Sequence, residues 1–480
     1  MALSAKVAAN TVVQVTSKVI STALSLVAVA VITRYLGNYG FGEYTTAITF
    51  ASIFTIAGDL GLTMVTTQLI SRPGANVNRM MSNLFTFRLV SAAIITALGP
   101  LLVLFFPYSA EVKEGVFVAS IAFFFILLCQ VFVSLFQREL RTDKIALAEV
   151  GSRVLLAAGS IAAVSLGWSI AGILWVMAAA NGINFLFHYL FARPYATTGF
   201  AYDRAVWRDI MKRSWPLVLT IILNLVYLKT DTLLLSLLKG PADVGLYGAA
   251  YKVIDVLVTI PFILGGTVLP IMVARWQKSD KADFNRMWQR IFDGSFMIAA
   301  PMVVGGWVLA GPIMALVAGN EFIAAGAILR ILIFAVGFIF FSSFFSYTMI
   351  SFDRQKLMIG AYLLTAATAL VLYLVFIPRY SYTAAAFITV YSEVLITLLA
   401  WRLVRRTGGI SIDWRVPAKL LVAAVAMGAV VYALPIDAAT LPGIISKIAI
   451  GVVIYGALVF SSGAITRAEL IQMIRRSTSA

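Results

Sequence analysis

The chain has 480 residues, of which 61% are hydrophobic and only 12% are charged, and its mean hydropathy is +0.95. Soluble domains average about 45–50% apolar and about 25% charged residues, so this composition excludes a soluble globular protein. The net charge of +16 would suggest a nucleic-acid partner in a soluble protein. In a membrane protein, the meaning of this charge depends on which side of the bilayer holds the basic residues. No nucleic-acid partner is therefore expected.

Long apolar stretches bounded by charge, glycine or proline predict about fourteen transmembrane helices, because a spanning helix needs about 20 apolar residues. The stretches are continuous and lack the two-residue alternation of a β-barrel, which favours an all-α polytopic fold. The predicted spans are 7–33, 43–70, 80–106, 115–136, 145–166, 169–192, 214–238, 245–273, 288–316, 325–351, 357–377, 381–403, 416–434 and 442–463.

The basic residues indicate the orientation of these spans. If the N-terminus is cytoplasmic, 26 of the 37 basic residues fall in inner segments and only five in outer loops. The positive-inside rule therefore predicts that both termini are cytoplasmic and that the chain is a multi-pass protein of the cytoplasmic (inner) membrane.

An internal repeat is visible across the longest hydrophilic interval, which lies near the middle of the chain. At an offset of 203, four residues of the first half match four residues of the second half, namely Gly37, Gly42, Tyr44 and Ala47 with Gly240, Gly245, Tyr247 and Ala250. Six spans in each half give both the same orientation, which is the parallel kind of repeat. The predicted domains are a six-helix bundle over 1–193, a cytoplasmic linker over 194–213, a second six-helix bundle over 214–406, and two further helices with a cytoplasmic tail over 407–480.

The turns between these spans carry a family resemblance. The segments are Arg34-Tyr-Leu-Gly37 with Gly42-Glu-Tyr44, Lys229-Thr-Asp231 with Gly245-Leu-Tyr247, Asp59-Leu-Gly-Leu62, Val268-Leu-Pro270 and Gly319-Asn-Glu-Phe322. Together they resemble the polysaccharide-transporter branch of the multidrug/oligosaccharidyl-lipid/polysaccharide (MOP) exporter superfamily over about residues 1–410. The resemblance implies a fold like that of the multidrug and toxic compound extrusion (MATE) transporters. It also implies that a polyprenyl-pyrophosphate-linked oligosaccharide is flipped to the outer leaflet with energy from an ion gradient or the membrane potential.

Charged residues at membrane depth are the main candidates for function, since each costs at least about 2.5–3.5 kcal/mol unless it has a partner or water. In the first predicted span, Asn10, Gln14 and Lys18 recur at four-residue spacing and form one polar stripe, with Lys18 near the midplane. We expect Lys18 to face the central cavity and bind the pyrophosphate or an acidic sugar, with Asn10 and Gln14 beside it. The alternative is a structural ion pair with Asp59, which is also a candidate for coupling or gating.

Two more cations lie in predicted inner halves of spans. Arg88 and Arg153 are both placed to form a vestibule for a diphosphate, although Arg153 has Glu149 four residues earlier on the same face as an alternative partner. Glu393 is deep in its span and has no evident partner in the sequence, so it is a candidate proton carrier.

In the second half, Asn224 shares a helix face with Asp231, and Lys252 neighbours Asp255 on the next span. An Asp231–Lys252–Asp255 cluster is either a gate or coupling-ion site or a buried ionic lock. Lys229 points away from the face of Asn224 and is either a separate cavity cation or a side chain that snorkels outward.

Sequence motifs give no support for an enzyme, because the chain has no Walker A sequence, no metal-spaced His/Cys set and no evident nucleophile triad. We therefore expect no metal and no cofactor, apart from H⁺ or Na⁺ as a coupling ion. The predicted function is a flippase for a lipid-linked repeat unit of a surface polysaccharide, working by alternating access, with membrane lipids and a polysaccharide polymerase or ligase complex as partners of a monomer. The alternatives are a lipid II flippase, a drug/cation antiporter of the same superfamily, and, more remotely, a membrane-embedded enzyme of polysaccharide assembly.

Overall fold

The computed structural model describes residues 2–59, 62–70, 76–278, 280–438 and 440–463. Within these ranges, side chains are not described at 2–12, 15, 57, 59, 63–65, 68, 213 and 215–228. The predicted site residues Asn10, Asp59 and Asn224 therefore have side chains outside the described part.

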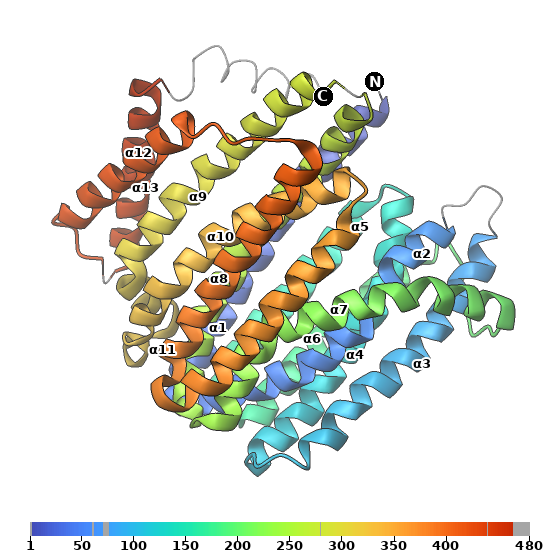
Figure 1. Cartoon of the computed structure of the whole chain (residues 1–480). Helices are drawn as coiled ribbons and strands as arrows, with labels where there is room; N and C mark the ends of the chain where they lie inside the picture. The colour runs from blue at the N-terminus through green and yellow to red at the C-terminus, as the bar shows by residue number, and fades with distance from the viewer. Residues whose placement is uncertain (1, 60–61, 71–75, 279, 439, 464–480) are drawn as a thin grey trace. The chain divides into compact units, whose positions relative to one another are not determined.

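The described chain is built of α-helices and short 3-10 turns, with no strand (Figure 1). Eleven of its helices are long and apolar enough to cross a membrane, so the chain is a multi-pass membrane protein. The α-helices are α1 (Ala2–Asp59), α2 (Leu62–Ile70), α3 (Val77–Val103), α4 (Ala110–Arg138), α5 (Thr142–Ser165), α6 (Ile170–Ala192), α7 (Arg204–Leu238), α8 (Pro241–Gln277), α9 (Lys281–Ala318), α10 (Ala325–Ser351), α11 (Met358–Gly408), α12 (Arg415–Ala433) and α13 (Leu441–Ser461).

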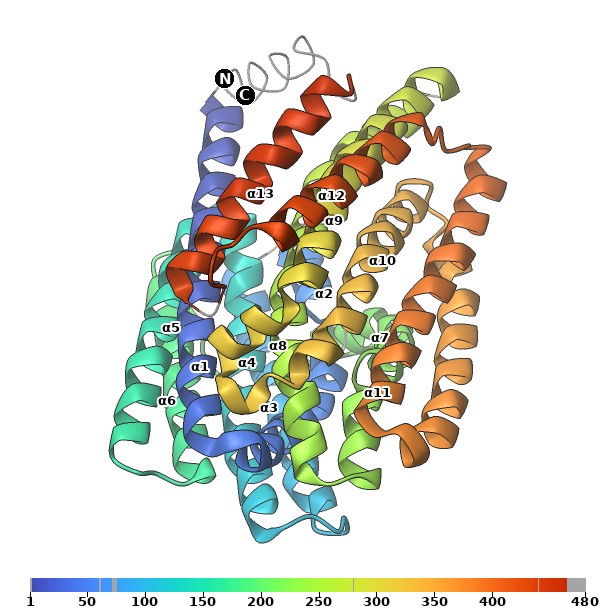
Figure 2. The same ribbon diagram turned by 90° about the vertical axis from the view of Figure 1, so that its left-hand side faces the viewer.

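Two of the helices are interrupted by a residue outside helical geometry. The break in α1 is at Gly37, whose φ of 62° is readily adopted by glycine, and the break in α11 is at Ser381, whose φ of 50° is unusual for a residue with a side chain. Uninterrupted, the 51 residues of α11 would extend about 77 Å, more than twice the hydrocarbon thickness. Instead α11 folds back on itself (Figure 2). Each break falls at the junction of two predicted spans, and the count of about fourteen stays a prediction.

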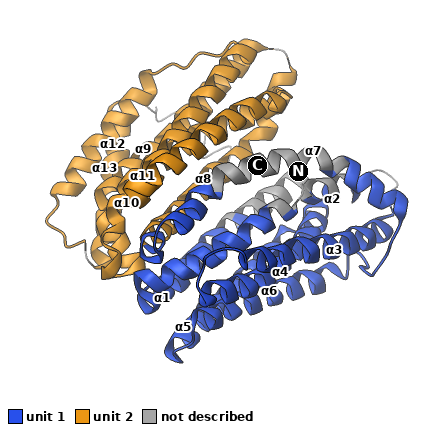
Figure 3. Ribbon diagram, turned by 60° about the horizontal axis from the view of Figure 1, so that its bottom comes forward, with its two compact units in different colours: residues 1–245, 480 blue, residues 246–479 orange. Residues whose placement is uncertain are grey.

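The chain divides into two compact units, residues 1–245 and 246–479, which Figure 3 shows in different colours. This division lies beyond α7, because α7 packs on α1, α2 and α3, whereas the sequence pattern placed the boundary at the linker over 194–213. In the first unit, α4 lies between α3 and α6, and its Phe132, Leu135 and Phe136 are fully buried in the core.

In the second unit, α9 is the central helix. It packs against α10 on one side and against α12 and α13 on another. The Trp288 ring is fully buried and stacks on Phe292 and Phe345, while its indole N–H donates to the Thr348 hydroxyl at 3.0 Å. A satisfied indole N–H allows this large ring to be buried in the core.

The internal repeat has a direct counterpart in a glycine contact within the first unit. A Cβ added to Gly42 would lie 1.7 Å from the Pro241 carbonyl oxygen, and one added to Gly245 would lie 1.9 Å from the Asn38 carbonyl oxygen. Both pairs of equivalent residues, Asn38 with Pro241 and Gly42 with Gly245, are related by the sequence offset of 203. The contact is therefore unchanged when its two sides are exchanged, as expected for a pseudo-two-fold repeat.

The linker between α6 and α7 is held along the first turns of α3. Every second backbone N–H of the linker, from Thr197 to Asp203, donates to a polar side chain of α3. The acceptors are Asn78 Oδ1 at 3.0 Å, Ser82 Oγ at 3.2 Å, Thr86 Oγ1 at 2.9 Å and Asn83 Oδ1 at 2.7 Å. Extended chain presents alternate N–H groups to one side, so a polar helix face at three- and four-residue spacing can bind them all.

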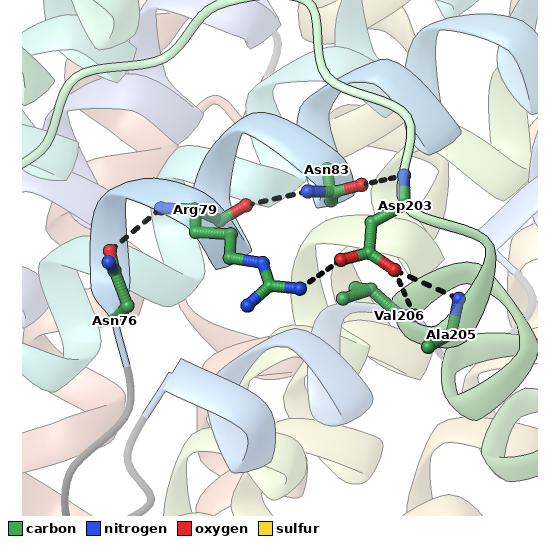
Figure 4. Close-up of polar contacts among 6 residues, drawn as sticks. All are labelled: Asn76, Arg79, Asn83, Asp203, Ala205 and Val206. Carbon is green, nitrogen blue, oxygen red and sulfur yellow. Dashed lines mark hydrogen bonds and ion pairs between the residues drawn. The ribbon is translucent and has the colours of Figure 1, made fainter.

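The last residue of this linker starts the next helix (Figure 4). The Asp203 side chain accepts the N–H groups of Ala205 and Val206, which caps α7, and it also forms an ion pair with Arg79. Asn83 bridges the two elements, because its amide nitrogen donates to the Arg79 carbonyl while its oxygen accepts the Asp203 N–H. As a result, residues 204–213, which the sequence analysis placed in the linker, begin a helix.

We expect Gly42→Ala to destabilise the protein by about 1–3 kcal/mol, because the added methyl group overlaps a backbone carbonyl that cannot rotate away. The control is Gly240→Ala, since a Cβ at Gly240 meets no atom within 4 Å. The measurement is the melting temperature in detergent. Equal melting temperatures for both variants would show that the close glycine contact is not needed.

We expect Asp203→Asn to speed hydrogen exchange of the linker amides several-fold at neutral pH, because asparagine still caps α7 but cannot pair with Arg79. The Arg79 guanidinium, together with the N–H groups of Val206 and Ala205, holds the pKa of the Asp203 carboxyl below its ordinary value. The ion pair therefore protects the linker above about pH 4, and protection is lost as the pH falls through the folded-state pKa. Mass spectrometry of the 194–204 peptide measures both effects, and exchange that is identical in the two proteins would contradict them.

Candidate functional site

The Lys18 side chain on α1 forms an ion pair with Glu149 on α5, with 3.1 Å between Nζ and Oε1. Its alternative predicted partner was Asp59, so sequence reasoning found the charged residue but named a different carboxylate. Lys18 and Glu149 keep 43% and 26% of their side-chain surface exposed. Gln14, one turn earlier on α1, is exposed. Both side chains of the pair are therefore partly accessible.

Arg153 lies one turn after Glu149 on α5. The sequence analysis named Glu149 as its alternative partner, but Glu149 bonds to Lys18 instead. Within the described residues, Arg153 forms no ion pair, and its charge acts on the hydroxyl group of Tyr44 from α1. Lys18, Glu149 and Arg153 together form a charged cluster on α1 and α5 with two cations and one carboxylate.

Arg88 on α3 has contacts that favour a structural role. Its side chain is 1% exposed, Nε donates to the Leu127 carbonyl of α4 at 2.9 Å, and Nη1 donates to the Gly58 carbonyl of α1 at 2.9 Å. Three helices are thus joined through one guanidinium, whose several donors suit this geometry. The role of Arg88 in a vestibule for a diphosphate stays a prediction.

The charged residues of the predicted second-half site are divided between the two units. Asp231 on α7 is buried, and its Oδ1 accepts the N–H of Thr232 at 2.6 Å. Lys229, two residues earlier on α7, is partly buried. Lys252 and Asp255 on α8 belong to the second unit, where Lys252 is partly buried and Asp255 is exposed. The Asp231–Lys252–Asp255 cluster stays a prediction.

Glu393 on α11 is buried in the second unit with 5% exposure. The charge of the Glu393 carboxylate acts on the hydroxyl group of Tyr362, which belongs to the same helix. The Glu393 backbone carbonyl accepts a hydrogen bond from the Thr397 hydroxyl at 2.7 Å, and this hydroxyl also lies 3.1 Å from the Phe338 carbonyl of α10. A role as proton carrier stays a prediction.

The second unit contains a large apolar groove that sequence reasoning did not find. Its volume is about 1020 Å³, and it is lined by α9, α10, α11, α12 and the loop before α12. The lining is almost entirely Phe, Trp, Val, Leu, Ile, Ala and Gly, and its one charged residue is Arg330. The guanidinium of Arg330 lies over the Trp307 ring at 5.7 Å.

This groove runs along the helices for much of the membrane thickness. On α10 its lining extends from Arg330 to Phe345, which is about 22 Å at 1.5 Å per residue. In sequence, the apolar residues that line the groove cannot be told from those of any membrane-spanning helix. Only the packing of the helices shows that these residues surround a space. One of the two helices that follow the second predicted bundle, α12, contributes to this lining.

Comparison with known proteins places the chain in a family. The family model described as "Polysaccharide biosynthesis protein" matches residues 7–276, more than half of the chain. The chain belongs to this family. It is thereby a member of the MOP exporter superfamily, as the turn motifs predicted.

Solved structures of transporters share the fold. A structure of the lipid II flippase MurJ in an inward closed conformation matches with a TM-score of 0.74 and 15% identity, over 94% of this chain and 97% of that one. An inward-facing multidrug resistance transporter of the MATE family in the MOP superfamily matches with a TM-score of 0.66 and 14% identity, over 84% of this chain and 99% of that one. A MOP superfamily transporter from Pyrococcus furiosus gives a TM-score of 0.53 at 14% identity, over 82% of this chain and 96% of that one. No curated protein sequence matches the chain.

We expect Arg88→Gln to lower the melting temperature strongly, because each charge-assisted hydrogen bond to a carbonyl contributes about 1.5–3 kcal/mol. The matched control is Arg204→Gln, which makes the same change at an exposed position. The measurement is thermal melting of the purified protein together with its abundance in membranes. An Arg88→Gln protein that melts like the wild type but no longer binds polyprenyl pyrophosphate would instead place Arg88 in the substrate site.

Proposed function

We propose that this protein is a flippase that moves a polyprenyl-pyrophosphate-linked oligosaccharide, the repeat unit of a surface polysaccharide, from the inner to the outer leaflet of the cytoplasmic membrane. It works as a secondary transporter by alternating access, with both termini in the cytoplasm and with H⁺, Na⁺ or the membrane potential as the energy source. It catalyses no reaction of its own, and a polysaccharide polymerase or ligase complex takes up its product.

The observation that carries this proposal is the apolar groove of the second unit. A site for a water-soluble drug combines apolar walls with a few precisely placed polar groups, whereas a lipid-linked substrate must keep a long hydrocarbon chain out of water. A groove of about 1020 Å³ with a single charged lining residue suits a hydrocarbon chain. Its length of about 22 Å along α10 suits an extended polyprenyl segment that lies along the membrane normal.

The charged cluster of Lys18, Glu149 and Arg153 supports a role in binding the head group. Its excess of one cation favours an anion, and a pyrophosphate cannot cross hydrocarbon without such compensation. Because the polyprenyl chain is long and flexible, the head group can bind to the first unit and the chain to the second without a fixed distance between the two sites.

A lipid II flippase is the nearest alternative, since its substrate would need the same pyrophosphate site and the same groove. The MurJ flippase matches a larger share of this chain than the MATE transporter does, 94% against 84%. A drug/cation antiporter is less well supported, because the accessible charged cluster is cationic. An enzyme of polysaccharide assembly is the remote alternative, and it would show itself by incorporating labelled sugar.

Proteoliposomes that contain a fluorescent polyprenyl-pyrophosphate-linked oligosaccharide test the proposal. We expect Lys18→Ala to reduce head-group translocation at least about tenfold, since loss of a charge contact costs on the order of 1.5–3 kcal/mol. We also expect Val425→Trp to reduce translocation, because Val425 lines the groove and the indole would fill it. Protection of the head group from an external enzyme reports translocation.

The matched control is Val422→Trp on the same helix. Val422 is exposed like Val425 but does not line the groove, so the same bulk should be tolerated there. Equal translocation by wild type, Lys18→Ala and Val425→Trp would remove both sites from the function. Transport of small organic cations, with none of the lipid-linked glycan, would favour the antiporter.

A further inference from the structure

Glu149 already pairs with the Lys18 ammonium group, which in the proposed function binds the pyrophosphate. The Lys18 ammonium group has three donors, and one of them is directed to Glu149 Oε1 at 3.1 Å. A carboxylate and a phosphate are both anionic oxygen acceptors. They therefore compete for the same ammonium group.

Glu149 has a second cation within reach on its own helix. Arg153 is four residues further along α5, so the two side chains share one helix face, and a Glu that precedes its cation by four residues is the more favourable order. Within the described part of the chain, Arg153 forms no ion pair. Glu149 can thus pair with Lys18 across the helices or with Arg153 along α5.

We propose that Glu149 is an internal counter-ion that the pyrophosphate displaces from Lys18 and that then pairs with Arg153. The inference rests on the proposed function and deepens it, because it makes substrate binding an exchange of partners. No proton and no additional ion is needed for this step. The phosphate takes the place of the carboxylate on Lys18, and the carboxylate turns to the guanidinium one turn away.

Electrostatics at membrane depth favour an exchange over simple displacement. An ionised carboxylate left without a partner in low dielectric is costly, and the cost would be subtracted from the affinity for substrate. Arg153 removes most of that cost, because a side-chain rotation alone brings the two groups together. The pyrophosphate competes successfully for Lys18 since it carries more charge than one carboxylate.

Exposure distinguishes this pair from a purely structural lock. The Lys18 side chain keeps 43% of its surface, so an approaching anion can reach the ammonium group without prior unfolding of α1 from α5. A lock would be expected to be buried, as the Arg88 guanidinium is with 1% exposure. Among the described side chains, Glu149 also acts electrostatically on His188 of α6, and Arg153 acts on Tyr44.

The first test is Glu149→Gln, with undecaprenyl pyrophosphate in detergent micelles as the probe and microscale thermophoresis as the measurement. We expect about fivefold tighter binding, equivalent to about 1 kcal/mol at 1.4 kcal/mol per tenfold, because the competitor for Lys18 has lost its charge. The matched control is Glu139→Gln, which removes a carboxylate of similar exposure that pairs with Arg138 at 2.6 Å. Its affinity should equal that of the wild type.

The second test is Arg153→Gln in two backgrounds. In the wild-type background binding should weaken about fivefold, because the displaced Glu149 loses its second partner. In the Glu149→Gln background the same change should have little effect, since no carboxylate remains to be compensated. An equal loss in both backgrounds would show that Arg153 contacts the pyrophosphate itself and would overturn the exchange.

The outcomes separate this inference from the proposed function. If Glu149→Gln binds no more tightly, or only melts at a lower temperature, Glu149 is a structural partner and the inference is wrong. If Lys18→Ala binds the probe as well as the wild type, the head-group site of the proposed function is wrong. Tighter binding by Glu149→Gln that disappears in the Lys18→Ala, Glu149→Gln double variant supports both.

Discussion

The cost of placing charge in hydrocarbon is the constraint on which the arrangement of the first unit depends. Each charged side chain at membrane depth costs at least about 2.5–3.5 kcal/mol unless it finds a partner or water. Arg88 meets the constraint by complete burial and bonds to carbonyls of α1 and α4. Lys18 meets it with a carboxylate of α5 while staying accessible. The same requirement thus produces a structural joint in one place and a candidate binding site in another.

Sequence reasoning found the helices because their determinant is local. A run of about 20 apolar residues suffices to form a spanning helix, and the charged and glycine residues between two such runs indicate the span boundaries on either side of Gly37. The repeat was found for a related reason. Gly42 and Gly245 permit backbone approach that no other residue allows, and such positions keep their identity in both halves.

Pairing between helices was predicted less well because it depends on helix rotation and tilt, which periodicity does not fix. Depth along the sequence made Asp59 as good a partner for Lys18 as any carboxylate, whereas the packing of α1 on α5 brings Glu149 to it. The groove was missed for the same reason. Phe341 or Val425 would be read in sequence as facing core or lipid, and only the arrangement of four helices shows that they line a space.

In the proposed function, the groove and the charged cluster differ in how they distinguish their ligands. An apolar groove accepts any hydrocarbon chain of suitable length, because burial of apolar surface is not directional. In the proposed exchange, binding at Lys18 requires an anion strong enough to replace the Glu149 carboxylate that pairs with it. Membrane phospholipids would satisfy the first condition but carry less charge than a pyrophosphate for the second. If the proposed exchange operates, a carrier in a bilayer full of lipid chains gains its selectivity from that exchange, and the groove contributes affinity that becomes useful only once the head group has bound.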